Sequence, residues 1–266
     1  MDDLVAKIKK LPSPGRSTRS LAGKTPRHET RYRSVPLKAG RAILITGTDT
    51  GAGKTYVSCL LGRAMREKGF SVRPLKPVES GCKPGADGAP FPEDASFLRD
   101  SFGPELPLSA VCLYPLAAPV SPHLAAEAEG VAIDVGRIRS AIAAAAEASD
   151  LVLVEGAGGI TVDICAGYSF ADLAKDALLP VLVVAQNRLG VLNHLCLTLH
   201  FLRSGAIPVA GVVLNDATPE PFPARDGNEG EVRRIAGDRY LGRVPHGARF
   251  LPEGILAGLL GFFPRK

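Results

Sequence analysis

The sequence lacks the features that would mark a membrane protein, a secreted protein or a protein held together by metals or disulfides. No apolar run approaches the roughly 20 residues of a membrane helix, and no apolar segment near the start suits a secretory signal. The five cysteines, at positions 59, 82, 112, 165 and 196, include no Cys-x-x-Cys pair. We therefore expect a soluble, cytoplasmic protein whose thiols are reduced and mostly buried, without a zinc site.

Patterns for covalent or zinc-dependent hydrolysis are also missing. The sequence shows no Ser-His-Asp arrangement, no His-Glu-x-x-His motif and no carboxylate pair typical of glycosidases. His123 and His194 each stand alone, so we expect structural roles for both. The sequence therefore shows no constellation typical of a catalytic nucleophile.

Positive charge is concentrated in the first 40 residues. They contain ten Lys or Arg and three acidic residues, a net +7, so the other 226 residues carry −2 of the total of +5. This segment is rich in Pro, Ser and Gly, and we predict a disordered basic extension over residues 1–40. Residues 41–266 are predicted to form a single domain, whose charge gives no reason to expect nucleic-acid binding.

Short apolar runs predict strands that are buried on both faces. The runs are continuous and rich in Val, Ile and Leu, and they cover residues 42–45, 151–154, 181–184 and 209–214, with a further strand over 71–75. Helical patterns lie over residues 54–68, 135–148, 170–177, 191–203 and 229–236, and residues 217–228 are predicted to form a loop. The alternation predicts an α/β fold of the P-loop NTPase type, a mostly parallel sheet with helices on both faces.

The strongest motif is a glycine-rich turn between a predicted strand and a predicted helix, Gly47-Thr48-Asp49-Thr50-Gly51-Ala52-Gly53-Lys54-Thr55. The usual phosphate-binding pattern, G-x-x-x-x-G-K-[ST], would place its first glycine at Thr48, whereas here it stands at Gly47. The strand–loop–helix context still predicts nucleotide binding, because successive backbone N–H groups and the helix N-terminus attract phosphate. Lys54 is expected to reach the β- and γ-phosphates and Thr55 to bind Mg²⁺.

Charged and polar residues follow other predicted strands. Glu155 follows the strand over 151–154 and could bind the metal of a nucleotide, or it could serve as a helix N-cap or a loop ion pair. Lys76 follows the strand over 71–75 and could face the phosphates, although a surface lysine is the simpler interpretation. Asp94 lies at a probable helix start, where an N-cap is the default role. Asn215 and Asp216 could contact a base edge or simply terminate a strand.

Taken in order, these segments resemble the dethiobiotin synthases. The similarity covers about residues 42–216 and depends on Thr46–Thr50 with Gly53–Thr55, Lys76–Val78 with Ser80–Gly81, Glu93–Ala95, Ser121–His123, Val154–Gly159, Leu189–Gly190 with Asn193–His194, and Asn215–Asp216. The sequence departs from the family pattern at Gly51, where some members have Glu. It also departs after Gly242, where only Pro245 matches the loop on the adenine side.

The resemblance implies a role for each matching position. Lys54 and Lys76 would flank the transferring phosphoryl group, and Thr55, Asp94 and Glu155 would bind Mg²⁺. Ser80 would contact the substrate, while Gly190 and Asn193 would bind its carboxylate tail across a homodimer interface. The nucleotide site would comprise Thr50, Gly51, Ala52, Gly53, Lys54, Thr55, Asp94, Glu155, Gly156, Ala157, Gly158, Asn215, Asp216 and Pro245.

The resemblance also implies the reaction, in which ATP, CO₂ and 7,8-diaminononanoate give the ureido ring of dethiobiotin. A substrate amine would capture CO₂ as a carbamate, which would attack the γ-phosphate to form a carbamic–phosphoric anhydride. The neighbouring amine would then displace phosphate.

The alternatives are a partitioning-type ATPase and a regulatory ATPase without ligase activity. A partitioning ATPase would carry a second lysine near Asp49, and the acid there argues against it. A cobyrinate-type amidotransferase would need a glutaminase domain, for which the residues after Asp216 are too few.

Overall fold

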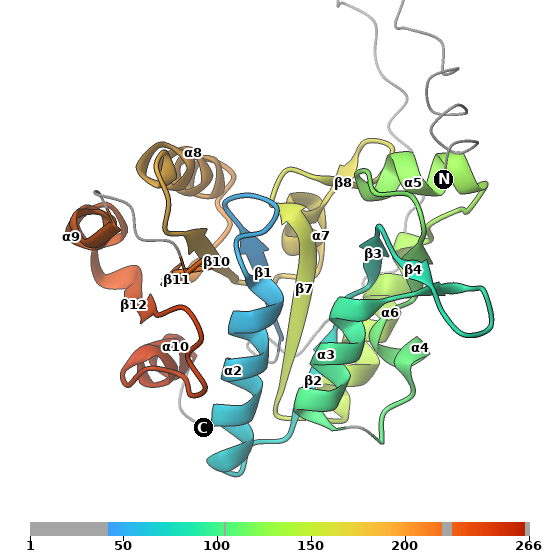
Figure 1. The fold of residues 1–266 in the computed structure, drawn as a ribbon, viewed down its shortest axis with the longest axis horizontal. Helices are drawn as coiled ribbons and strands as arrows, with labels where there is room; N and C mark the ends of the chain where they lie inside the picture. The colour runs from blue at the N-terminus through green and yellow to red at the C-terminus, as the bar shows by residue number, and fades with distance from the viewer. Residues whose placement is uncertain (1–41, 104, 220–224, 264–266) are drawn as a thin grey trace, which may run out of the picture.

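A wholly parallel six-stranded sheet forms the centre of the molecule (Figure 1). The computed structural model describes residues 42–103, 105–219 and 225–263, so the predicted extension over residues 1–40 lies outside the described residues. The strand order is β12-β11-β10-β1-β7-β2. The strands are β1 (Ala42–Gly47), β2 (Val72–Leu75), β7 (Leu151–Gly159), β10 (Val181–Gln186), β11 (Val209–Asn215) and β12 (Tyr240–Val244). The α/β prediction is thus confirmed.

Side chains alternate along each buried strand and enter two hydrophobic cores, one on each face of the sheet. In β1, Ala42 and Leu44 belong to one core, while Ile43 and Ile45 belong to the other. The first core is covered by α5 (Pro122–Glu129), α6 (Val135–Glu147), α7 (Phe170–Asp176), α8 (Val191–Ser204) and α9 (Arg225–Ala236). The second is covered by α2 (Lys54–Glu67), α3 (Glu93–Phe102), α4 (Leu108–Val111) and α10 (Ile255–Phe262). Continuous apolar strands therefore fit, because neither face meets water.

Three small two-stranded sheets accompany the central one, and their strands were not predicted. The parallel pair is β3 (Val78–Ser80) with β6 (Tyr114–Leu116). The antiparallel pairs are β4 (Lys83–Pro84) with β5 (Pro90–Phe91), and β8 (Asp163–Cys165) with β9 (Tyr168–Ser169). A short 3₁₀ turn, η1 (Gly237–Arg239), precedes β12. Strand β3 follows β2 after only two residues and so stands at the carboxyl end of the main sheet.

Two boundaries predicted from the sequence are wrong. The strand expected to end at Val154 continues as β7 to Gly159, because Glu155 pairs with Ile45 and Gly159 pairs with Gly47 of β1. The loop expected over residues 217–228 ends early, since α9 begins at Arg225. In both cases tertiary contacts outweigh the low strand and helix propensities of glycine.

Candidate active site

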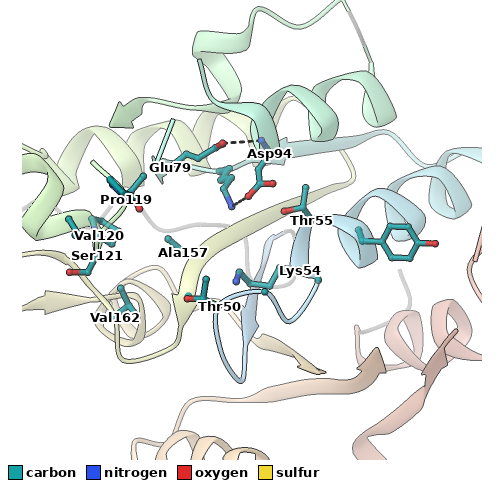
Figure 2. Close-up of a pocket in the computed structure, with 18 residues that line it drawn as sticks. Thr50, Lys54, Thr55, Glu79, Asp94, Pro119, Val120, Ser121, Ala157 and Val162 are labelled. Atoms are coloured by element: carbon teal, nitrogen blue, oxygen red, sulfur yellow. Dashed lines mark hydrogen bonds and ion pairs between the residues drawn. The ribbon is translucent and has the colours of Figure 1, made fainter. Parts of the chain in front are cut away.

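A cleft of about 690 Å³ lies at the carboxyl ends of β1, β2 and β7, where parallel α/β sheets bind ligands. Figure 2 shows Thr50, Lys54 and Thr55 on one side and Glu79 and Asp94 facing them from the other. The far end is formed by a mostly apolar wall of Pro119, Val120, Ser121, Pro122 and Val162. The glycine-rich turn and the strand ends, widely separated in sequence, therefore meet at one cavity.

The glycine-rich turn has the backbone geometry of a phosphate-binding loop. Gly53 adopts a left-handed conformation at φ 86° immediately before α2, and no side chain caps this helix among the described residues. A Cβ on Gly53 would lie 2.1 Å from Asn215 Nδ2, so only glycine fits. The first N–H groups of α2 therefore remain available to an anion, supported by the helix dipole.

Glu155 lies at the centre of a buried polar cluster beneath the cleft. Its side chain is 1% exposed and accepts hydrogen bonds from Thr55 Oγ1 at 2.6 Å and Ser58 Oγ at 2.9 Å. Lys76 Nζ lies 2.8 Å from Glu155 Oε1 and 3.0 Å from Asp94 Oδ2. The surface-lysine interpretation of Lys76 is therefore wrong, as is the N-cap interpretation of Glu155.

The electrostatics of the two lysines follow from this cluster. Burial alone would lower the pKa of Lys76, but the carboxylates of Glu155 and Asp94 outweigh it and raise the pKa above its ordinary value. The pKa of Lys54 is lowered by burial and by the neighbouring Lys76 charge, against the attraction of Glu155 and Asp94. Lys76 thus remains cationic, and Lys54 adds a second ammonium group beside it.

Asp94 is not the N-cap of α3, contrary to the default prediction. Pro92 occupies the cap position and offers no side-chain acceptor. The carboxylate of Glu79, on β3, instead accepts hydrogen bonds from the backbone N–H groups of Asp94 and Ala95, each at 2.9 Å. The side chain of Asp94 is consequently free to face Lys76 across the cleft.

Asn215 and Asp216 terminate β11 beside the phosphate-binding loop, as the sequence suggested. Asn215 Nδ2 donates to the Ala52 carbonyl at 2.9 Å, while its buried Oδ1 accepts no hydrogen bond from the described residues. Asp216 is 4% exposed and is held by Asn187 Nδ2 at 2.7 Å and by Arg243 at 2.9 Å. Asn215 therefore keeps a buried acceptor atom without a partner among the described residues, whereas Asp216 is engaged within the protein.

The other predicted residues divide into those in the cleft and those outside it. Thr50, Gly51, Gly53, Lys54, Thr55, Lys76, Ser80, Asp94, Ala157 and Gly158 line the cleft. Ala52 and Gly156 are buried behind it. Gly190 and the exposed Asn193 stand at the start of α8 and do not line it, and Pro245 lines a separate depression along β12.

Several site residues had no prediction. Ser58 lies one helical turn after Thr55. It is a polar residue on an otherwise apolar helix face, and this pattern could have indicated a place in the site. Arg243, Pro119 and Val120 carry no local signal, because only the packing of the chain brings them to the site. Ser121 and Pro122 of the same wall belong to a segment of the family resemblance, to which no role was assigned. Arg188 pairs with Asp49 and ties the end of β10 to the phosphate-binding loop.

Two further observations concern the described residues as a whole. Within the described residues, no group of three or more His, Cys, Asp or Glu side chains could hold a metal ion unaided. None of the described helices is both long and apolar enough to cross a membrane.

Comparison with known proteins gives a consistent result. A family model described as an AAA domain matches residues 41–252. Proteins named ATP-dependent dethiobiotin synthetase BioD are similar: that of Anaeromyxobacter dehalogenans strain 2CP-C is 42% identical over 77% of this chain and 90% of the relative. The Aromatoleum aromaticum protein is 39% identical over 82% of this chain and 96% of its own length. A solved ParA family ATPase from Chlorobium tepidum TLS aligns with a TM-score of 0.47 at 16% identity, over 85% of this chain and 91% of that one.

Proposed function

This chain belongs to the ATP-dependent dethiobiotin synthetase family, and we propose that its cleft carries out that reaction on 7,8-diaminononanoate, CO₂ and ATP. It is thus an ATP-dependent ligase that forms carbon–nitrogen bonds. The observation that carries the assignment to this site is the meeting of Lys54, Lys76 and Asp94 at one cleft beside the glycine-rich loop, with Glu155 buried beneath it.

The nucleotide is proposed to lie along the loop from Thr50 to Thr55. Its phosphates would accept hydrogen bonds from the N–H groups at the start of α2, and they would form an ion pair with Lys54. The unpartnered Oδ1 of Asn215 suits a base that presents an amino group, as adenine does. Asp216, held by Arg243, would keep Asn215 in place, and Pro245 would stand beyond it on the base side.

Magnesium fits the residues that are present. Thr55, Asp94 and Glu155 offer one hydroxyl and two carboxylate groups, the oxygen ligands that Mg²⁺ prefers, and phosphate oxygens would complete the set. When bound, the ion would neutralise charge on the phosphates. In this structure Lys76 forms ion pairs with the carboxylates of both Asp94 and Glu155. We propose that its ammonium group turns toward the phosphoryl group when ATP and Mg²⁺ bind.

The proposed chemistry uses the two lysines as positioned cations. A carbamate and a terminal phosphate are both anions, and bringing them together is unfavourable unless charge is neutralised nearby. Lys54 and Lys76 supply that charge in a buried setting, where it acts strongly. The phosphoryl group passes to the carbamate oxygen as ADP leaves, and the second amine then forms the new carbon–nitrogen bond and releases phosphate.

The substrate is proposed to lie between Ser80 and the apolar wall that includes Val120 and Val162. Such a wall suits the alkyl chain of a diamino acid. Its carboxylate would extend to Gly190 and Asn193 of a second copy, since these residues do not line the cleft of their own chain.

A homodimer in the cytoplasm is accordingly proposed. Leu189, just before α8, and Leu197, in the middle of that helix, are 83% and 60% exposed, which suits a contact between copies. All five cysteines are free thiols, as expected in a reducing compartment.

The test is a coupled ADP-release assay with the full-length protein, in which diaminononanoate, bicarbonate and Mg²⁺ are varied separately. We expect release to require all three and dethiobiotin to form in equal amount. ADP release that is independent of the diamine would indicate an ATPase instead. The dimer is tested separately by sedimentation, where a monomeric mass at assay concentration would refute it.

A further inference from the structure

Glu79 is a buried carboxylate to which neither the sequence motifs nor the proposed reaction gives a role. It lies on β3, is 7% exposed, and directs one oxygen to the Asp94 N–H and the other to the Ala95 N–H. Figure 2 shows this side chain reaching from its strand to the start of α3. An internal cap is therefore supplied to the helix by a residue 15 positions earlier in the chain.

The start of α3 packs in the core through the buried Ala95, but it has few other polar contacts among the described residues. Its own cap position is Pro92, which has no side-chain acceptor, and Glu93 pairs with the exposed Lys83 at 3.1 Å. An exposed pair of this kind contributes little. Glu79, by contrast, is buried and stands on a strand whose register with β6 is fixed by the pairing of Glu79 with Pro115. The carboxylate thus supplies the side-chain acceptors that the cap position of α3 lacks.

The charge on Glu79 suits this task. Burial raises the pKa of Glu79 above its ordinary value, and the two N–H groups and the nearby Lys76 offset only part of that rise. A carboxylate at a helix N-terminus is also stabilised by the helix dipole. The geometry consequently favours two charge-assisted hydrogen bonds to one turn of backbone.

What this cap controls is the position of Asp94. The side chain of Asp94 is 48% exposed, and the contact that holds it over the cleft is the 3.0 Å ion pair with Lys76. If Lys76 turns toward the phosphates, that contact is lost, and the backbone hydrogen bonds to Glu79 remain. The position of Asp94 would then depend on the hydrogen bonds that the Asp94 and Ala95 N–H groups donate to the Glu79 carboxylate.

We propose that Glu79 is a positioning residue for the metal–nucleotide complex, acting through Asp94. This inference rests on the proposed function, because it assumes that Asp94 binds Mg²⁺ together with ATP. Residues that orient metal ligands in this way typically contribute a factor of roughly 10 to 100 in metal affinity. The competing explanation is that Glu79 is a stabilising helix cap and nothing more.

The two explanations are separated by a matched pair of variants. Glu79→Ala removes the cap of α3, while Asp134→Ala removes the cap of α6, where Asp134 accepts the Gly136 N–H at 2.7 Å. Helix α6 does not line the cleft. Each variant should lose about 1 kcal/mol or more of stability, since this is the usual contribution of a cap. The metal site should respond only to the change at Glu79.

The measurement is Mn²⁺ binding, followed by electron paramagnetic resonance in the presence of a non-hydrolysable ATP analogue. We expect Glu79→Ala to weaken Mn²⁺ binding at least about 10-fold and Asp134→Ala to change it less than about twofold. Glu79→Gln, which keeps one oxygen acceptor, should fall between wild type and Glu79→Ala. The same order should appear in the Mg²⁺ concentration needed for half-maximal turnover, with kcat at saturating Mg²⁺ changed less.

Hydrogen exchange at the Asp94 and Ala95 amides provides the second readout, and it should be faster in both Glu79 variants. Unchanged Mn²⁺ affinity alongside faster exchange would overturn the proposal and leave Glu79 as a cap alone. If Glu79→Ala does not fold, Glu79→Gln decides by the same criteria. Absence of diamine-dependent turnover in the wild type would refute the proposed function, whereas the Mn²⁺ measurement tests Glu79 independently of that result.

Discussion

Replacement of Lys76 by methionine tests the central feature of the site. Methionine keeps most of the buried hydrocarbon and removes the ammonium group that lies 2.8 Å from Glu155 and 3.0 Å from Asp94. Glu155 is 1% exposed, so its charge cannot be solvated by water once its cation is gone. The hydroxyls of Thr55 and Ser58 would still donate to it.

The expected cost can be estimated from these contacts. Breaking a buried ion pair by removal of one partner costs about 3–5 kcal/mol. The lower value applies here, because Glu155 keeps two hydroxyl donors and Asp94 is half-exposed. A loss of about 3 kcal/mol corresponds to a melting temperature lower by about 6–12 °C in a domain of this size. Turnover should fall by a factor of about 10² or more, because a cation at the transferring phosphoryl group is lost, while ATP binding survives through the loop.

Three further variants make this prediction specific: Lys83→Met, Glu155→Gln, and Glu155→Gln combined with Lys76→Met. Lys83→Met removes an exposed lysine paired with Glu93, and it should cost less than about 1 kcal/mol. Glu155→Gln combined with Lys76→Met should cost less than the sum of the single changes, because both buried charges disappear together. Urea unfolding of the wild type, the three single variants and the double variant, together with ADP release, measures these quantities. Additive costs, or a Lys76→Met protein as stable and active as wild type, would refute the reasoning.

The remaining predictions concern the loop, the base and the thiols. Gly53→Ala should abolish binding of a fluorescent ATP analogue, because the backbone is left-handed and the new Cβ would meet Asn215; near-normal binding would contradict the loop geometry. Asn215→Leu should weaken ATP binding, measured by titration, by roughly 1–3 kcal/mol, because the buried acceptor is lost. The binding of GTP should change less. Burial raises the pKa of Cys82 and Cys112 to about 12. At pH 8, Ellman's reagent should therefore modify the exposed Cys196 much faster than either of these thiols. Equal rates in the folded protein would show that Cys82 and Cys112 are not buried.

Much of the fold could be predicted because its signals are local. Four continuous apolar runs predicted the strands β1, β7, β10 and β11, and the helices after them followed from periodicity. Strand β12 was missed because Tyr240, Leu241 and Arg243 are only partly buried and lie at the sheet edge. The extent of β7 was missed because its last residues are mostly glycines, which have a low strand propensity. They are held in the strand by pairing with β1, which is a tertiary contact.

The cysteines illustrate the limit of composition. Their free state was predicted correctly, since no spacing suggested a bridge or a zinc site. Their mostly buried state was not: only Cys82 and Cys112 are buried, while Cys196 is exposed on α8. Burial depends on which face of a helix meets the core, and that is a property of the packed structure.

The sequence by itself determined the class of the protein and the segment that is expected to bind phosphate. A glycine-rich turn between a strand and a helix works through neighbouring backbone groups, so the order of a few residues from Gly47 to Thr55 suffices to define it. Only the tertiary structure decided how the charges are paired. Lys76, Asp94 and Glu155 come from three separate segments, and their distances follow from β2 and β7 lying side by side. The same holds for Glu79, whose contact with α3 depends on the position of β3 at the end of the sheet.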